Sequence, residues 1–414
     1  MHILYFHQHF STPSGSTGNR SYEMARKLLA RGHTVTVVCG SYSGAVTGVT
    51  TPFIKGVREG IVDGIHVVEY ELAYSNKDSF FKRTLIFLKF AIRSMRFAVK
   101  TKCDLIFATS TPLTAALPGI ISKWVTKKTF IFEVRDLWPE LPREMGVIKN
   151  PLILGLMSLL EWMAYKSADA LIALSPGIKD GILRLGISAS KVTVIPNGCD
   201  IPLFEEHNQK WQPEGVESHH FMAVYSGTHG IANGLNIVIE AAKILKDRNY
   251  DQIRFVLVGQ GKLKAALVKR ATELQLDNIV FLDAVEKAKV SKLLSRANIG
   301  MQVLTNVPAF YFGTSPNKFF DYIASGLPVL MNYPGWLAEK IEKNQCGKVV
   351  APDDPVAFAN CLIELDNNRP QLIEMSKSAL QLAKSEFNRE YLSNEFVDWL
   401  EKWGATQLHF SKAE

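Results

Sequence analysis

The segment from Thr314 to Val329 carries the residues with the clearest chemistry, because a helix start there leads into a buried strand. Ser315 suits the N-cap position and Pro316 the first helical position, so free N–H groups and the positive dipole end of the helix could face a phosphate. Lys318 would add positive charge, and Asp321, one turn further on, could accept hydrogen bonds from ribose hydroxyls. The pattern predicts a site for a nucleoside diphosphate, although an ordinary capped helix has the same local pattern.

Three loops of small residues follow predicted strands, where main-chain N–H groups could approach a phosphate closely. The first runs from Pro13 to Gly18, the second from Gly227 to Asn236, and the third is Gly259-Gln260-Gly261. Loops after the strands lie at the ligand-binding edge of a parallel sheet. We therefore expect these loops to contact substrate, the alternative being plain strand-to-helix turns.

Arg135 and Asp136 follow another buried strand, at the same predicted edge. A guanidinium and a carboxylate there could fix sugar hydroxyls or a leaving diphosphate. A local ion pair is the alternative interpretation.

Short apolar runs alternate with helical patterns along most of the chain, which is typical of parallel sheets buried on both faces. The predicted strands of the first half are residues 3–6, 34–38, 104–108, 129–134, 170–173 and 192–195, and those of the second half are 222–225, 254–258, 279–282, 299–303, 328–331 and 348–350. A helix over residues 21–31 would end at Gly32, and a last helix over about 389–403 has a broad apolar face. The fold class is therefore α/β, with two doubly wound, Rossmann-like domains facing a cleft. We expect a first domain over residues 1–205, a linker over 206–218, a second domain over 219–386 and a C-terminal helix within 387–414.

The length of 414 residues, with 47% hydrophobic and 21% charged residues, suits two globular domains. Five scattered cysteines indicate neither a disulfide framework nor a zinc site, and the strand-like N-terminus lacks the features of a signal peptide, so we expect a cytoplasmic protein. A net charge of +7 favours acidic partners, whether nucleotide phosphates, anionic lipid or nucleic acid.

Several blocks, taken together, resemble the retaining GT-B glycosyltransferases of family 4, and within that family the WbuB-like transferases of bacterial surface-polysaccharide synthesis. The blocks are Gly15-Ser16-Thr17-Gly18-Asn19-Arg20, Gly32-His33-Thr34-Val35-Thr36-Val37, Arg135-Asp136-Leu137-Trp138-Pro139-Glu140, Ala173-Leu174-Ser175-Pro176-Gly177, Ile195-Pro196-Asn197-Gly198-Cys199-Asp200, Tyr225-Ser226-Gly227, Val258-Gly259-Gln260-Gly261 and the helix start after Thr314. Singly most are weak, but their order and spacing are specific. The resemblance implies transfer of a sugar from a nucleotide diphosphate with retention at the anomeric carbon, and a C-terminal helix that crosses back onto the N-terminal domain.

The resemblance also implies which residues form the site. The catalytic candidates are Arg135, Asp136, Lys318 and Asp321. The residues expected to bind the donor are Gly15, Ser16, Gly18, Arg20, Gly227, Thr228, Asn233, Gly259, Gly261, Thr314, Ser315, Asn317, Lys318 and Asp321.

The chain departs from the family pattern at several of these positions. Arg135 stands where the family often has histidine, Thr228 and Asn233 replace a basic pair, and Gly313 occupies the first of two acidic positions, with Asp321 at the second. We expect Lys318, and after it Arg135, to neutralise the diphosphate.

We expect no metal and no other cofactor in the reaction. The sequence has no D-x-D pair, and His7, His9 and His229 lack the i,i+4 spacing of metal ligands. The charge of the leaving diphosphate would instead be stabilised by a helix N-terminus and basic side chains.

The segment Phe80–Lys102 would form a helix with a narrow cationic stripe beside a mainly apolar surface. The stripe consists of Lys82, Lys89, Arg93, Arg96 and Lys100. Such a helix could lie on an anionic bilayer, the alternative being a domain helix with its charges in water. The family resemblance favours the bilayer, because its acceptors are often polyprenyl-diphosphate sugars at the inner membrane face.

These observations predict a peripheral membrane transferase that moves an N-acetylated amino sugar, such as N-acetyl-L-fucosamine, from UDP to a polyprenyl-diphosphate-linked saccharide in O-antigen or capsule synthesis. Nucleic acid is not an expected partner. The alternatives are a non-catalytic module that binds sugar nucleotides or lipid, an epimerase of the same fold, and a phosphorylase, for which no pyridoxal-phosphate lysine is identifiable.

Overall fold

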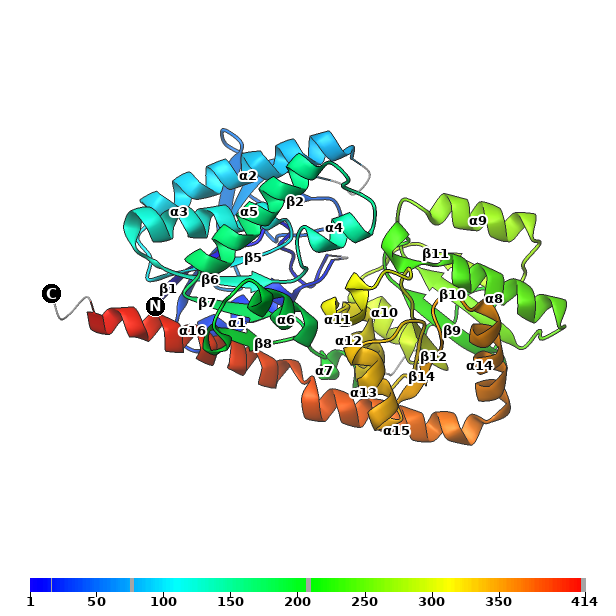
Figure 1. Cartoon of the computed structure of the whole chain (residues 1–414). Helices are drawn as coiled ribbons and strands as arrows, with labels where there is room; N and C mark the ends of the chain where they lie inside the picture. Colours follow the sequence, from blue (N-terminus) through cyan, green and yellow to red (C-terminus); the bar gives the residue numbers. More distant parts are fainter. Residues whose placement is uncertain (16, 75–77, 206–209, 411–414) are drawn as a thin grey trace. The chain divides into compact units, whose positions relative to one another are not determined.

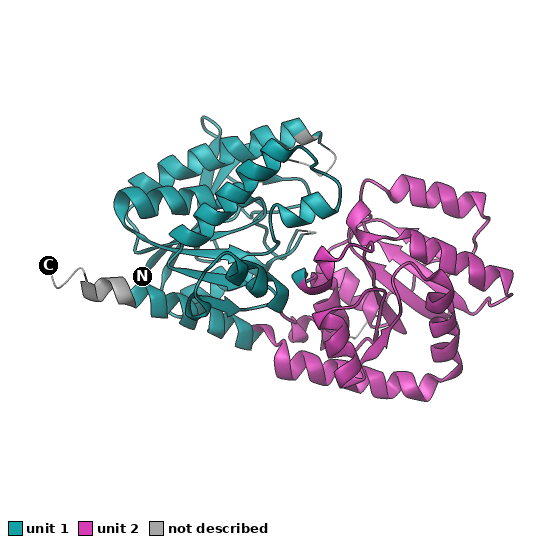
Figure 2. Cartoon of the chain, viewed as in Figure 1, with its two compact units in different colours: residues 1–196, 313–315, 390–414 teal, residues 197–312, 316–389 magenta. Residues whose placement is uncertain are grey.

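The computed structural model describes residues 1–15, 17–74, 78–205 and 210–410, which form two compact units (Figure 2). The first contains Met1–Pro196, Gly313–Ser315 and the chain from Glu390 onward, and the second contains Asn197–Phe312 and Pro316–Arg389. The predicted linker lies partly outside the described residues, at 206–209, and its remainder, 210–218, is a loop of the second unit.

The first unit is built on an eight-stranded sheet with the order β3-β4-β2-β1-β5-β6-β7-β8. Its strands are β1 (His2–Phe6), β2 (Thr34–Tyr42), β3 (Val57–Val62), β4 (Ile65–Tyr74), β5 (Leu105–Thr109), β6 (Thr129–Val134), β7 (Ala170–Ala173) and β8 (Val192–Val194). Its helices are α1 (Arg20–Ala30), α2 (Phe80–Lys100), α3 (Leu117–Thr126), α4 (Glu140–Glu144), α5 (Pro151–Ser167), α6 (Pro176–Arg184) and α16 (Arg389–Phe410), with the 3-10 turns η1 (Leu113–Ala116) and η2 (Ala189–Lys191).

The second unit is built on a six-stranded parallel sheet with the order β11-β10-β9-β12-β13-β14. Its strands are β9 (Phe221–Ser226), β10 (Ile253–Val258), β11 (Ile279–Leu282), β12 (Ile299–Gln302), β13 (Val329–Met331) and β14 (Gly347–Val349). Its helices are α7 (Ile201–Glu205), α8 (Asn236–Asp247), α9 (Lys264–Glu273), α10 (Lys287–Leu294), α11 (Ala309–Gly313), α12 (Asn317–Ala324), α13 (Trp336–Asn344), α14 (Pro355–Asn367) and α15 (Arg369–Glu386), with the 3-10 turn η3 (Ile231–Asn233).

The strands match the predicted apolar runs closely, and the α/β fold class is confirmed. Strands β6, β7 and β11 begin and end at the predicted residues. Nearly every residue of β1, β5, β6 and β7 is buried, because helices cover both faces of the sheet. Helix α1 ends as expected at Gly32, where φ is +83°.

Helices lie on both faces of the first sheet (Figure 1). Helices α2, α3, α5 and α6 share one buried core with it, and α1 and α16 share the other. The C-terminal helix therefore packs on the first unit, as predicted: Phe396 lies edge to face against Phe107 of β5, with ring centroids 5.0 Å apart. It is longer than the predicted span and runs to Phe410.

The hairpin of β3 and β4 was not predicted. Strand β3 is the antiparallel edge of an otherwise parallel sheet. It is joined to β4 by Asp63 and Gly64, both at positive φ, 49° and 85°. An Asp-Gly pair between two strands is a strong hairpin signal, so the sequence did contain this information.

The start of α12 also differs from the prediction. Pro316 is the N-cap, with φ −75° and ψ 127°, and Asn317 is the first helical residue. The prediction that Ser315 caps this helix is wrong by one position, because Pro316 has extended rather than helical backbone angles.

Candidate functional site

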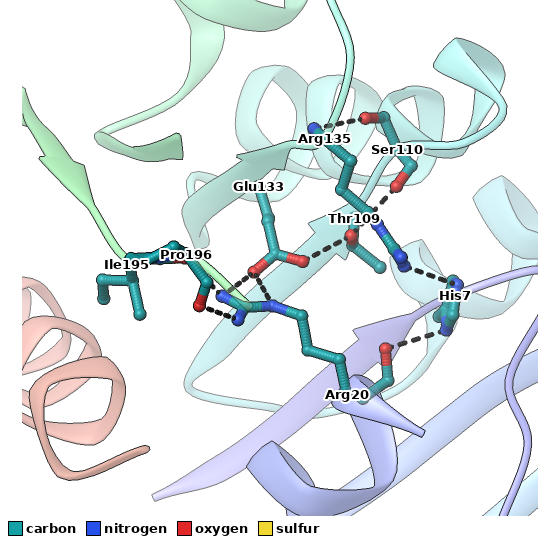
Figure 3. Close-up of polar contacts among 9 residues, drawn as sticks. His7, Arg20, Thr109, Ser110, Glu133, Arg135, Ile195 and Pro196 are labelled. Carbon is teal, nitrogen blue, oxygen red and sulfur yellow. Dashed lines mark hydrogen bonds and ion pairs between the residues drawn. The ribbon is translucent and has the colours of Figure 1, made fainter. Parts of the chain in front are cut away.

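In the first unit, polar side chains collect where β1, β5 and β6 end (Figure 3). Strand β1 lies between β2 and β5, so the chain leaves the sheet in opposite directions on its two sides, and ligands bind at such a point. His7 follows β1, Ser110 follows β5 and Arg135 follows β6. The Arg135 guanidinium lies 3.4 Å from His7 Nε2, and its backbone N–H donates to Ser110 Oγ at 2.9 Å.

His7 is buried and neutral in this setting. Burial, helped by the charge of Arg135, holds the pKa of His7 well below its usual range. A guanidinium can only donate, so His7 Nε2 accepts from Arg135 and Nδ1–H donates to Ser21 Oγ at 2.8 Å. His7 therefore orients Arg135. Nothing in the sequence links His7 to Arg135, because the two residues are 128 positions apart.

Asp136 lies beside Arg135 and is held by Thr111. The Thr111 hydroxyl donates to Asp136 Oδ2 at 2.9 Å. Burial raises the pKa of this carboxyl, while the hydrogen bond from Thr111 and the charge of Arg135 oppose the shift. The two predicted residues, Arg135 and Asp136, are thus brought together at the strand edge, each fixed by a different neighbour.

Arg20 has a different environment from the one expected of a ligand-binding residue. Its guanidinium is 2% exposed and makes two hydrogen bonds to Glu133 Oε2, at 3.0 and 2.8 Å. It also donates to the carbonyls of Ile195 and Pro196, at 2.9 and 2.7 Å (Figure 3). The other carboxylate oxygen of Glu133, Oε1, accepts a hydrogen bond from the Thr109 hydroxyl at 2.7 Å. This geometry gives Arg20 a structural role beneath the site.

The loop from Pro13 to Gly18 is only partly described, because Ser16 lies outside the described residues. Gly15 is buried, and a side chain there would place Cβ 2.2 Å from Ser11 Oγ. A side chain at Gly15 would displace the Ser11 hydroxyl and crowd the backbone of Gly44 and Val46, whereas Gly18 is exposed.

In the second unit, Lys318 lies at the start of α12 without an ion-pair partner among the residues that the structure describes. Its ammonium is 3.4 Å from Asn233 Oδ1 and 5.2 Å from the centre of the Tyr225 ring. Its Cε packs against Gly227, where an added Cβ would lie only 3.2 Å away. Burial lowers the pKa of Lys318 to about 8. The predicted residues Gly227 and Asn233 thus lie against the side chain of the predicted Lys318, whose ammonium has no ion-pair partner among the described residues.

Asp321 follows Lys318 by three residues and pairs with a lysine that the sequence analysis missed. Asp321 Oδ1 lies 3.2 Å from Lys287 Nζ, and the same ammonium lies 3.6 Å from Asp200 Oδ2. All three side chains retain some exposure, at 15% for Asp321, 22% for Lys287 and 26% for Asp200. Lys287 begins α10, 34 residues before Asp321, and no local motif marks it.

The loops after β9 and β10 interlock through their glycines. A Cβ on Gly259 would lie 1.9 Å from the Gly227 carbonyl oxygen, and one on Gly261 would lie 2.4 Å from that of His229. The His229 N–H donates to the Gln260 carbonyl at 3.0 Å. Gly259 and Gly261 are therefore needed for the close approach of the two loop backbones. This packing places the loop with the exposed Thr228 beside Lys318.

The remaining predicted donor residues lie before or at the start of α12. Thr314 and Ser315 are partly buried, and Asn317 is exposed as the first helical residue. Across the described ranges, no group of three or more His, Cys, Asp or Glu side chains is arranged to hold a metal ion.

The fold has many solved counterparts. Sucrose-phosphate synthase from Thermosynechococcus elongatus superposes with a TM-score of 0.75 at 17% identity, covering 98% of this chain and 99% of that one. Anabaena HepE in complex with UDP gives a TM-score of 0.66 at 18% identity, covering 97% and 100%. Two Rossmann-like units with ligand edges of this kind define the GT-B fold.

Family models identify the chain more closely. The model of glycosyltransferase family 4 matches residues 17–202, and the model of group 1 glycosyl transferases matches residues 221–368. The protein therefore belongs to the family 4 glycosyltransferases of the GT-B fold, and it is a transferase.

Two relatives are named for bacterial polysaccharides. WcaI of Escherichia coli (strain K12), whose name refers to colanic acid biosynthesis, is 26% identical over 346 residues, which are 79% of this chain and 82% of WcaI. The amylovoran biosynthesis glycosyltransferase AmsK of Erwinia amylovora is 23% identical over 222 residues, and the match spans about half of each protein, 53%.

Proposed function

We propose that this protein is a retaining glycosyltransferase that moves a sugar from a UDP-sugar to a polyprenyl-diphosphate-linked saccharide in the synthesis of a bacterial surface polysaccharide. The observation that carries the proposal is Lys318, a cation at a helix start that lacks an ion-pair partner among the described residues. A partly buried cation such as Lys318, without a carboxylate beside it, is costly unless a ligand supplies the anion. The names of WcaI and AmsK support the polysaccharide role.

In this proposal, the second unit binds the donor and the first unit carries the groups that act at the sugar. As the bond from the anomeric carbon to the diphosphate breaks, negative charge accumulates on the diphosphate. Lys318 and the N–H groups at the start of α12 stabilise that charge. Asp321 accepts hydrogen bonds from the ribose, and Arg135 and Asp136 hold the sugar hydroxyls. No metal is required in this scheme.

The subgroup resemblance suggests an N-acetylated amino sugar, such as N-acetyl-L-fucosamine, as the transferred group. The purified protein should release UDP when it is incubated with the correct UDP-sugar and a lipid-diphosphate saccharide, and the product should keep the anomeric configuration of the donor. A panel of UDP- and GDP-sugars, assayed with and without EDTA, tests the donor and the metal together. UDP binding without release would favour a non-catalytic module, an epimerised sugar nucleotide would favour an epimerase, and activity restored only by a divalent cation would contradict the metal-free scheme.

Lys318→Met should weaken UDP binding by about 10- to 100-fold, because a hydrogen bond to a charged group contributes about 1.5–3 kcal/mol. It should also raise the thermal midpoint of the ligand-free protein at pH 7. The pKa of Lys318 in the folded protein, about 8, lies below the 10.5 of an unperturbed lysine. Below pH 8 the charged lysine therefore destabilises the folded state, and the free energy of unfolding rises between pH 8 and 10.5. Calorimetry with UDP and thermal melts measure both effects.

The pH dependence provides the control for this lysine. Wild-type affinity for UDP should fall above about pH 8, as Lys318 loses its proton, whereas Lys318→Met should not show this step. An unchanged affinity in the variant, or the same pH step in both proteins, would contradict the assignment.

Asp321→Ala should weaken UDP binding by about 1–3 kcal/mol, because it leaves the ribose hydroxyls without their acceptor. The matched ligand is 2′,3′-dideoxy-UDP, which lacks those hydroxyls and should bind wild type and variant alike. An equal loss with both ligands would indicate that the substitution acts through Lys287, whose ion pair to Asp321 it also breaks.

We also propose that the first unit attaches to an anionic membrane. The predicted stripe of α2 is only partly free: Lys89, Arg96 and Lys100 are exposed, Lys82 pairs with Asp78 at 2.7 Å, and Arg93 donates to the Gly56 carbonyl at 3.0 Å. The structure also exposes a set of large apolar side chains on α2, α3 and α5. These three helices cover one face of the first sheet, and α3 contacts both α2 and α5 (Figure 1). This apolar helix face consists of Phe81, Leu85, Leu88, Ile92, Trp124, Val125, Leu152, Leu156, Leu159 and Trp162.

Exposed apolar side chains on adjacent helices, flanked by basic residues, are typical of interfacial membrane binding. No helix in the described part of the chain is long and apolar enough to span a bilayer. We propose a peripheral attachment, through the apolar helix face and the basic stripe together.

The double variant Leu156→Asp, Leu159→Asp should bind vesicles about tenfold or more weakly. Full burial of each leucine side chain in hydrocarbon contributes at most roughly 1.5–3 kcal/mol to binding, and the variant loses this contribution. The matched control is Ile231→Asp, Ile373→Asp, which changes exposed residues of the second unit. Co-sedimentation with anionic vesicles measures the effect. Equal binding of the two double variants would contradict attachment through α5.

A further inference from the structure

A groove of about 980 Å³ opens between strand β3 and the C-terminal half of α2. It lies on the first unit, on residues separate from the strand-end site described above. Its charged lining residues are Lys55, Arg58, Glu59, Arg93, Arg96 and Lys100. Five cations against one carboxylate leave the groove strongly positive.

The cations of the groove fall into two groups. Arg58 and Arg93 are fixed by the protein: Arg58 lies 2.8 Å from Glu69 and over the Phe53 ring, and Arg93 donates to the Gly56 carbonyl and lies over the Tyr70 ring. These contacts hold both guanidinium groups in place along the side of the groove, which is called its wall below.

The other three cations, Lys55, Arg96 and Lys100, have no acceptor among the residues that the structure describes. The one carboxylate of the groove, Glu59, lies 3.3 Å from His66 Nε2 and does not pair with them. Three cations that share one groove without a counter-charge suit an anionic ligand with several acceptor oxygens.

The rest of the lining is apolar and includes Ile54, Val57 and Phe97. Ile54 is 71% exposed, so an uncovered apolar surface lies beside the free cations. Part of the apolar helix face, from Phe81 to Ile92, lies on the same helix, α2, which contains no acidic residue between Phe80 and Lys100. A ligand with a phosphate and a hydrocarbon part would satisfy both kinds of surface.

We propose that this groove binds the phosphate headgroup of an anionic phospholipid. This inference rests on the proposed membrane attachment and specifies which lipid the attached protein selects. Lys55, Arg96 and Lys100 hold the phosphate oxygens, Arg58 and Arg93 shape the wall, and the apolar residues contact the upper part of the acyl chains.

The test is vesicle co-sedimentation with two compositions, phosphatidylcholine alone and phosphatidylcholine mixed with phosphatidylglycerol. The groove variant Lys55→Glu, Arg96→Glu, Lys100→Glu should lose binding to the mixed vesicles by on the order of 100-fold or more, since each basic group near an anionic surface contributes about 1 kcal/mol. Its weaker binding to phosphatidylcholine should remain. The neutral variant with glutamine at the same three positions should lose most of the same selectivity, and unchanged thermal midpoints show that both variants fold.

The control variant carries the same change in net charge away from the groove: Lys210→Glu, Lys269→Glu, Lys343→Glu, all exposed residues of the second unit. It should bind mixed vesicles as wild type does. An equal loss in control and groove variants would overturn the proposal, because net charge alone would then explain lipid selection.

Calorimetry with inorganic phosphate and with glycerophosphoglycerol distinguishes the lipid from a soluble phosphate. Weak binding of both, lost in the groove variant, supports a headgroup site that needs the bilayer. Affinity for a soluble phosphate as high as for the mixed vesicles would overturn the lipid assignment. If wild type and groove variant pellet alike with mixed vesicles, the groove proposal fails and Arg96 and Lys100 of the basic stripe do not contribute, while attachment through the apolar helix face stands. If wild type binds neither vesicle, both proposals fail.

Discussion

Asp136→Asn is expected to lower kcat by about 100- to 10,000-fold while changing the affinity for UDP little, because the carboxylate acts at the sugar and not at the nucleotide. The amide keeps the size of the side chain and can still accept from Thr111, so the local fold should persist. Steady-state rates with saturating donor, together with calorimetry for UDP, separate the two effects.

Thr111→Val provides a graded companion to this substitution. Thr111 donates to the Asp136 carboxylate and so opposes the rise in its pKa. Its removal should raise that pKa further, and the acid limb of the rate profile should move to higher pH, since the reaction requires the ionised carboxylate. If Asp136→Asn keeps the wild-type rate, the prediction for Asp136 is wrong, and Arg135 and Asp136 form only a local structural pair.

Glu133→Ala is expected to lower the free energy of unfolding of the first unit by about 3–5 kcal/mol, because it leaves the Arg20 guanidinium buried without its counter-ion. The double variant Arg20→Leu, Glu133→Leu should be less destabilised than the single one, since it removes both charges. Urea unfolding, followed by the fluorescence of the first unit, measures the difference.

The ion pair of Lys27 with Glu390, whose carboxylate side chain is 72% exposed, serves as the control for the buried pair. Glu390→Ala should change the free energy of unfolding by about 0–1 kcal/mol, because solvent screens such pairs. If Glu133→Ala is as mild as this control, the buried pair does not stabilise the unit as described.

The sequence predicted the sheets well because parallel strands are buried on both faces, and continuous apolar runs such as residues 129–134 have few other interpretations. It did not predict β3 and β4, because β3 is a half-exposed edge strand and polar residues such as His66 and Glu69 interrupt the apolar signal of β4. Only the turn at Asp63 and Gly64 marks them.

The arrangement of the candidate site was predictable where its residues lie in one motif. Lys318 and Asp321 are three residues apart on one helix, and Arg135 and Asp136 are adjacent, so local spacing placed them correctly relative to each other. The partners of these residues are distant in sequence: Lys287 lies 34 residues from Asp321, and His7 lies 128 residues from Arg135. Strand order sets those pairings, and the residue pattern of a single sequence contains no direct record of it. Arg20 illustrates the same limit, because its partner Glu133 is 113 residues away.

The packing of α16 on the first unit has a consequence for protein engineering. Leu392, Phe396, Val397 and Leu400 complete a core whose other members come from the first 200 residues, so a fragment that stops at Pro196 would leave Ile3 and Phe107 without part of their cover. A chimera that exchanges donor-binding units between two related enzymes must therefore replace residues 197–389 with the foreign segment and retain the original C-terminal helix. The exchangeable segment is thus internal to the chain. Simple fusion of one enzyme's N-terminal half to another's C-terminal half would pack a foreign C-terminal helix against the core of the first unit.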